Sequence, residues 1–247
     1  MPVDQSFWLI CAAFYLVDNL VFHASREIII VEGWKGRWLP SFPVQRYRLG
    51  QRLVTLLPLF LPFFGAARAG WLCEEGRSEH RVRRTRRLLR VRSVRLLPYR
   101  VLSAAVFLTI FALGPIVTER AGLAYALVAV APLHLAWVMV LAILLVLGRR
   151  TWGLTWQSVA GVIFECAVCP GYFANICRRL SLRHAALPVD PVALATVTAG
   201  ADAGERAFQA ATLLADDLME HDEISEEDIE AATKWRAALL PQGGLSG

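Results

Sequence analysis

The chain has 247 residues, of which 56% are apolar, and a formal net charge of +5 at pH 7. Its apolar residues occur in blocks, the longest over 101–148, which excludes a single soluble core and favours membrane-spanning helices. Arginine supplies 24 of the 26 basic residues, and the charge is divided unevenly: residues 1–189 carry 23 basic and 9 acidic side chains, whereas residues 190–247 carry 3 and 12.

The first segment, residues 1–24, is predicted to contain a transmembrane helix over Ser6–Ala24. No positively charged region precedes the apolar run and no small-residue cleavage site closes it, so we expect the segment to be retained rather than removed as a signal peptide. The cysteines number five and lack a secretory spacing, so a disulfide framework is not expected.

Residues 25–100 are predicted to form a basic cytoplasmic and interfacial region. Within it lies the apolar segment 53–72, whose fifteen-residue run Leu53–Ala67 is shorter than the roughly 20 residues that a transmembrane helix needs. Pro58 and Pro62 also interrupt the backbone hydrogen bonds of a helix, and lipid offers no replacement. We therefore expect a re-entrant or interfacial segment here, with a membrane span as the alternative.

Two further patterns lie in the same region. The stretch "EIIIVEG" at 27–33 is typical of a short strand, but it has no evident partner strand. Ten arginines occur over 77–100 without the interleaved aromatic residues that stack on bases, so we expect no nucleic-acid partner. Basic residues near a membrane attract anionic headgroups, and a topology signal without a specific ligand is the alternative. The residues predicted to bind lipid headgroups are Arg83, Arg84, Arg86, Arg87 and Arg90.

Residues 101–148 are predicted to form a transmembrane helical hairpin. One helix is expected over Val101–Thr118 and a longer one over Gly122–Gly148. The turn between them is so short that the two helices must be antiparallel neighbours. Two arginines follow directly, at 149 and 150, as expected where a helix leaves the membrane on its cytoplasmic side.

Residues 149–189 are predicted to form an interfacial or re-entrant segment that contains three cysteines. Structural zinc needs four Cys or His ligands, and a redox thiol needs an exposed thiolate. The weak metal candidates here are Cys166, Cys169, Cys177 and His184. The sequence favours cysteines that are ordinary apolar packing residues, so we expect no metal and no cofactor, with a metal or redox site as the alternative.

The last segment, residues 190–247, is predicted to be an acidic helical hairpin outside the membrane. Asp190-Pro191 has the pattern of an N-cap followed by proline in the first helical turn. Positive residues that flank spans stay in the cytoplasm, so the distribution of arginine places this C-terminal segment in the cytoplasm of a bacterial cell and the spans in its inner membrane.

Asp18, His134 and Glu165 are the ionisable residues inside apolar segments, and they are the candidates for catalysis. Such residues usually face the interior of a helix bundle and have partners. They could serve as acid–base groups, but three scattered residues are not a motif, so interhelical hydrogen bonds that fix packing are the favoured explanation.

Together these segments predict an all-α integral membrane protein. It would have three full transmembrane helices, or four if residues 53–72 also cross, with one or two re-entrant segments and a small cytoplasmic C-terminal hairpin. The favoured function is that of a non-enzymatic accessory or scaffold protein. Its expected partners are anionic lipid headgroups and another membrane or cytoplasmic protein, and a homo-oligomer is compatible with the sequence. The alternative is a membrane-embedded enzyme that acts on a lipid or quinone, or that uses the cysteines.

Overall fold

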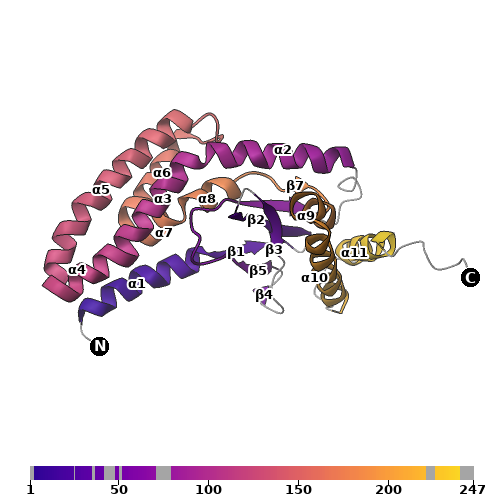
Figure 1. Cartoon of the computed structure of the whole chain (residues 1–247), viewed down its shortest axis with the longest axis horizontal. Helices are drawn as coiled ribbons and strands as arrows, with labels where there is room; N and C mark the ends of the chain where they lie inside the picture. The colour runs from indigo at the N-terminus through magenta and orange to yellow at the C-terminus, as the bar shows by residue number, and fades with distance from the viewer. Residues whose placement is uncertain are drawn as a thin grey trace, which may run out of the picture. The chain divides into compact units, whose positions relative to one another are not determined.

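The computed structural model describes residues 3–24, 26–34, 37–41, 48–49, 52–70, 79–220 and 226–239 (Figure 1). They form two compact units. The first, here called the helical unit, comprises Met1–Leu20, Leu57–Gly65 and Val94–Arg183. The second, here called the sheet unit, comprises Val21–Leu56, Ala66–Ser93 and His184–Gly247. Each unit therefore combines segments that are far apart in the sequence.

The helical unit contains one long helix that is interrupted by a different hydrogen-bond pattern. Leu97–Ala121 forms 25 residues of helix, in which the five residues Thr109–Leu113 are π-helical. The Gly114 N–H donates to the Thr109 carbonyl, five residues earlier, and Pro115, which has no N–H, follows directly. The helices of the unit are α1 (Val3–Asp18), α3 (Leu97–Leu108), α4 (Gly114–Ala121), α5 (Leu123–Gly148), α6 (Trp156–Val168), α7 (Pro170–Ala174) and α8 (Ile176–Leu182).

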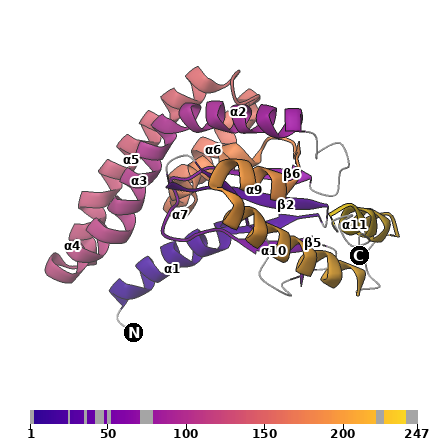
Figure 2. The ribbon, with the colours of Figure 1, turned by 45° about the vertical axis from the view of Figure 1, so that its right-hand side comes forward.

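The helices α3–α4 and α5 form an antiparallel hairpin, and they lie side by side in both views (Figures 1 and 2). Gly122 makes the turn with φ of 88°, a value that glycine adopts readily, and its N–H donates to the Thr118 carbonyl at 2.9 Å. The long apolar helices predicted over 101–118 and 122–148 are therefore confirmed. Both are long and apolar enough to cross a membrane.

Helix α1 is shorter than predicted. It ends at Asp18, and residues 20–23 form a strand instead of continuing the helix to Ala24. Its 16 residues correspond to about 24 Å, less than the roughly 30 Å of bilayer hydrocarbon, so a full first span is not confirmed. The helix begins beside α4, where Trp8 Nε1 donates to Thr118 Oγ1 at 2.9 Å.

Helix α6 runs back along α5. The Arg149 guanidinium, at the end of α5, lies 4.5 Å above the Trp156 ring at the start of α6. Farther back along α5, His134 Nε2 lies 3.1 Å from the carbonyl oxygen of Cys166, near the end of α6. The two contacts make α6 antiparallel to α5 and bring its last turn to the middle of that helix. The chain then breaks before Pro170 and continues as α7 and α8.

The sheet unit contains strands, so the expectation that the whole protein is α-helical is wrong. The stretch at 27–33 has partners on both sides: Ile30 in β2 pairs with Pro40 in β3 and with Ala67 in β6, both antiparallel. One sheet has the order β3-β2-β6-β7 and the other β1-β5-β4. The strands are β1 (Leu20–His23), β2 (Glu27–Glu32), β3 (Trp38–Ser41), β4 (Arg48–Leu49), β5 (Arg52–Leu56), β6 (Ala66–Gly70) and β7 (Leu187–Pro188).

The apolar segment 53–72, expected to be re-entrant or interfacial with a membrane span as the alternative, forms no helix in its described residues 53–70, so the spanning helix is wrong and the interfacial placement stays a prediction. Its first residues belong to β5, which ends at Leu56, and a connection over 57–65 leads into β6. Residues 71 and 72 lie outside the described residues. Leu53 and Thr55 are buried whereas their neighbours are less so, which is the alternation of a strand. Leu53, Leu57 and Phe64 of this segment are buried in the two units, whereas Leu56 and Phe60 are 54% and 84% exposed.

The acidic C-terminal segment packs on the sheet as three helices rather than as a separate hairpin. Asp190 caps the first of them as predicted, because its Oδ1 accepts from the N–H groups of Val192 and Ala193 at 2.8 and 3.1 Å. Thr198 Oγ1 donates to the Trp38 carbonyl of β3 at 2.9 Å. The helices of the sheet unit are α2 (Glu79–Arg95) up to Ser93, α9 (Pro191–Ala199), α10 (Ala201–Met219) and α11 (Glu226–Leu239).

Candidate functional site

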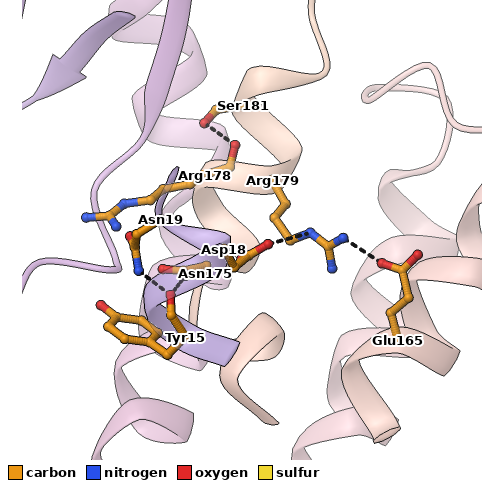
Figure 3. Close-up of polar contacts among 8 residues, drawn as sticks. All are labelled: Tyr15, Asp18, Asn19, Glu165, Asn175, Arg178, Arg179 and Ser181. Carbon is orange, nitrogen blue, oxygen red and sulfur yellow. Dashed lines mark hydrogen bonds and ion pairs between the residues drawn. The ribbon is translucent and has the colours of Figure 1, made fainter. Parts of the chain in front are cut away.

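A cluster of charged and polar side chains lies inside the helical unit, where α1, α6 and α8 meet (Figure 3). Arg179 Nη2 lies 2.6 Å from Glu165 Oε2, and its Nε lies 3.7 Å from Asp18 Oδ1. The same guanidinium lies 5.0 Å from the centroid of the Tyr172 ring. The structure therefore brings two of the three predicted catalytic candidates, Asp18 and Glu165, to one arginine.

Arg178 has a different role from its neighbour. Its side chain is only 1% exposed, and its Nη2 donates to the carbonyl oxygens of Pro58 and Leu61, the latter at 2.8 Å. Tyr15 donates its hydroxyl proton to the Leu59 carbonyl of the same connection. Because the prolines prevent a helix here, the Pro58 and Leu61 carbonyls accept turn bonds from the N–H groups of Leu61 and Phe64, at 3.4 and 3.2 Å. Arg178 adds a second donor to each of them, and Tyr15 bonds the Leu59 carbonyl between them. Both side chains therefore position the 57–65 connection.

Two buried asparagines complete the cluster at the end of α1. Asn19 Nδ2 donates to the Tyr15 carbonyl at 2.7 Å, and Asn175 Nδ2 donates to the same oxygen at 3.4 Å. The Leu57 N–H in turn donates to the Asn19 carbonyl at 3.0 Å. These bonds satisfy a backbone group that the helix end leaves free, so the asparagines fix where α1 stops.

The charges of the cluster balance. Asp18 and Glu165 contribute two negative charges, and Arg178 and Arg179 contribute two positive ones. Balanced, hydrogen-bonded charges are the form in which ionisable groups are tolerated in a low-dielectric interior. The arrangement is therefore well suited to holding three helices and a connection together, and it leaves only Glu165 substantially open, with 44% of its side chain exposed.

The third catalytic candidate, His134, is buried in α5 outside the ion cluster. Its Nε2 donates to the Cys166 carbonyl at 3.1 Å, because a carbonyl oxygen can only accept, and its ring meets the Phe173 ring edge-on with centroids 5.7 Å apart. Among the described residues it makes no hydrogen bond or ion pair with Asp18 or Glu165. This geometry matches the interhelical packing bond considered from the sequence.

The cysteines and His184 do not come together as a metal site. Cys166 and Cys177 are buried, Cys169 is half-buried, and all three are free thiols. His184 belongs to the sheet unit, where burial and the nearby Arg92 lower its pKa. In the part of the chain that the structure describes, no group of three or more His, Cys, Asp or Glu side chains could hold a metal ion.

The predicted lipid-binding arginines lie on α2, and all five are exposed. The opposite side of the helix is buried through Val82, Thr85 and Leu89. Arg83 pairs with Glu79 at 2.6 Å within the helix. Large apolar side chains are exposed among the arginines toward the end of the helix, namely Leu88, Val91 and Val94 at 42%, 42% and 68%. The exposed face of α2 thus combines guanidinium groups with apolar side chains.

Comparisons of the chain with protein families, with curated proteins and with solved structures found no match.

Sequence reasoning missed the roles of Arg178 and Arg179, which it treated as topological charges at a membrane surface. Arg179 pairs with Asp18 across 161 positions (179 minus 18), a distance at which no spacing rule operates. One signal was present in the sequence. Two acidic residues within apolar segments require basic partners, and few basic residues lie directly after the apolar stretch 152–176.

Proposed function

We propose that this chain is a non-enzymatic accessory or scaffold protein of the bacterial inner membrane, anchored by the helices Leu97–Ala121 and Leu123–Gly148. The exposure of these helices supports a membrane setting. Only 33% and 28% of the most apolar 18-residue stretch of each helix are buried. A central helix of a soluble protein would be mostly buried, because exposed apolar area costs free energy in water.

The distribution of charged and aromatic residues supports an orientation. Arg149 and Arg150 directly follow α5, and the exposed Trp156 begins α6, as at a membrane–water interface. The turn at the other end of the hairpin contains a single basic residue, Arg120. Under the positive-inside rule the arginine-rich end of the hairpin is cytoplasmic, and so is α2, which leads into α3 at this end. The C-terminal segment belongs to the same unit as most of α2, so we place it in the cytoplasm as well.

The single observation that carries the function is the exposed face of α2. Five exposed arginines beside exposed Leu88, Val91 and Val94 form a surface with both the charge and the apolar contacts that an anionic lipid surface requires. The chain enters the first long apolar helix directly after α2, at Leu97. We propose that α2 lies on the cytoplasmic membrane surface and that the protein presents its sheet unit and acidic helices to a partner protein there.

Environment-sensitive fluorescence at position 91 tests this proposal. A Val91→Cys variant of the full chain is labelled and reconstituted into vesicles of zwitterionic lipid, with or without phosphatidylglycerol. A blue shift that depends on the anionic lipid and decreases with salt is expected, since salt screens such contacts. Changing Arg83, Arg87 and Arg90 to Gln should abolish the shift. The same change at the exposed Arg52, Arg120 and Arg206 should preserve it, and equal loss in both triple variants would contradict the proposal.

A second candidate function, an enzyme acting on a lipid or quinone, is favoured by one observation. Asp18 and Glu165 share Arg179, and Glu165 is partly open. Two carboxylates in different environments can divide the roles of acid and base. Incubation of the purified protein with phospholipid or quinone, followed by mass spectrometry of the products, tests it. A product that is lost in Glu165→Gln but retained in Glu119→Gln would favour the enzyme, and unchanged lipid and quinone would favour the scaffold.

A further inference from the structure

Four of the arginines on α2 surround a single spot on the surface of the helix. Arg83, Arg86, Arg87 and Arg90 stand at positions i, i+3, i+4 and i+7, and all four are exposed. Residues three and four apart are neighbours on a helix, with Cβ atoms about 5–6 Å apart. We call these four residues the arginine quartet. Within α2, whose residues 79–95 are all described, no other set with this spacing consists entirely of arginine.

The helix itself neutralises little of the charge of the quartet. Arg83 pairs with Glu79 at 2.6 Å, so the quartet and this glutamate together carry a net charge of +3 (four minus one). Arg86, Arg87 and Arg90 have no acidic residue three or four positions away in either direction. Like charges at these separations destabilise a helix. A ligand with more than one negative charge would relieve this repulsion.

The arrangement of the quartet matches two phosphates better than one. It divides into two pairs four residues apart, Arg83 with Arg87 and Arg86 with Arg90. A guanidinium group can donate two parallel hydrogen bonds to phosphate oxygens, so each pair can hold one phosphate. A single phosphodiester leaves one pair without an anion. When two phosphates belong to one molecule, binding of the first holds the second at high effective concentration, an advantage that two separate lipids lack.

The apolar neighbours of the quartet indicate a lipid rather than a soluble phosphate compound. Val91 lies four residues after Arg87, Val94 lies four residues after Arg90, and they are 42% and 68% exposed. Acyl chains can therefore contact the valines while the phosphates contact the quartet. We infer that the quartet recognises a lipid with two linked phosphodiesters, the chemistry of cardiolipin, in preference to a lipid with one. This inference rests on the proposed position of α2 on the membrane surface.

Fluorescence from a label at position 91 distinguishes the inference from the proposal on which it rests. The labelled Val91→Cys chain is reconstituted into zwitterionic vesicles with increasing fractions of either phosphatidylglycerol or cardiolipin, compared at equal phosphate. The blue shift should reach half of its maximum at an about tenfold lower phosphate fraction with cardiolipin, because the linked phosphates bind together. Equal half-maximal fractions for the two lipids would overturn the inference and leave α2 on the membrane. No shift with either lipid would overturn the membrane position of α2 itself.

Two double variants separate the quartet from the general charge of the helix. Arg86→Gln with Arg90→Gln removes one pair of the quartet and should abolish the preference for cardiolipin. Arg84→Gln with Arg95→Gln removes two exposed arginines of the same helix outside the quartet. It should weaken binding to both lipids and keep the preference. Glutamine is a good helix former, so α2 should persist in both variants, which thermal unfolding in detergent checks. An equal preference for cardiolipin in the two variants would overturn the inference.

Discussion

The two units of this chain use the same kinds of apolar residues for different purposes. In the helical unit, α5 is apolar around its whole circumference, and most of its most apolar window faces outward. In the sheet unit, the apolar run Ile28–Ile30 is fully buried between neighbouring strands. The helical unit thus exposes the apolar surface of its longest helix to an outside medium, whereas the sheet unit buries the apolar side chains of its central strand.

Removing apolar volume from β2 should have the largest effect, and it should be confined to the sheet unit. Ile30 is fully buried in the main hydrophobic cluster of the sheet unit. Ile30→Ala should lower the free energy of unfolding by about 3 kcal/mol, because it removes buried apolar area and leaves a cavity. Hydrogen exchange of peptides from β2 and from α5 measures the two units separately. Equal acceleration of exchange in both would show that the units do not unfold independently.

Adding volume between helices should disrupt the helical unit instead. A Cβ at Gly171 would lie 2.9 Å from the backbone oxygen of Cys11 and the backbone nitrogen of Tyr15. Gly171→Val should therefore separate α7 from α1 and destabilise the unit by about 2–3 kcal/mol, measured by thermal unfolding in detergent.

Gly161→Ala is the control for this prediction, since a Cβ there has free space. A loss of stability in this control as large as that in Gly171→Val would contradict the role of close helix contact.

The buried guanidinium of Arg178 should matter through hydrogen bonds rather than through volume. Arg178→Met keeps an extended apolar side chain but leaves the carbonyls of Pro58 and Leu61 without this donor, which should cost about 2 kcal/mol. Arg183→Met, on an exposed position close by, should be nearly neutral. Similar melting temperatures for the two variants would exclude the proposed support of the 57–65 connection.

The smallest expected effect is a pH dependence of the sheet unit. His23 is buried, its Nε2 lies 2.8 Å from Thr55 Oγ1, and burial lowers its pKa below the ordinary 6.5. The unfolded chain therefore binds a proton more readily, so stability should be complete above pH 6.5 and decrease as the pH falls below it. His184, whose pKa is also lowered, acts in the same direction.

Denaturant unfolding of the full chain at pH 8 and at pH 5.5, followed at β5, measures this dependence. His23→Gln should flatten it in part, because His184 remains. An undiminished dependence in His23→Gln would assign the effect to other groups.

The sequence predicted the helical unit better than the sheet unit, and the reason is physical. The helices over 101–118 and 122–148 depend on neighbours within a few positions, which local patterns reveal, and so does the N-cap at Asp190 in the sheet unit. The pairing of Ile30 with Ala67 depends on the distant stretch "AARAG", which has little strand character of its own. Because β6 was not recognised as a strand, the apolar run Leu53–Ala67 that leads into it resembled a membrane segment.

The candidate site was predicted only by residue type. An ionisable residue in an apolar segment needs a partner, which correctly selected Asp18, His134 and Glu165 as notable. Their actual contacts, Arg179 for the two carboxylates and the Cys166 carbonyl for the histidine, are set by how α1, α5, α6 and α8 pack. Packing across such sequence distances leaves no periodic signal in a single sequence.

Labelling of cysteines in the α4–α5 hairpin tests most directly whether its helices cross a membrane. Arg120→Cys places a thiol at the turn, and Arg150→Cys places one just after α5. A membrane-impermeant maleimide is applied to intact spheroplasts expressing each variant, with the parent protein giving the background from its native cysteines. The account predicts labelling of position 120 from outside and of position 150 only after permeabilisation. Labelling of both positions from the same side, or recovery of the protein in the soluble fraction, would contradict it.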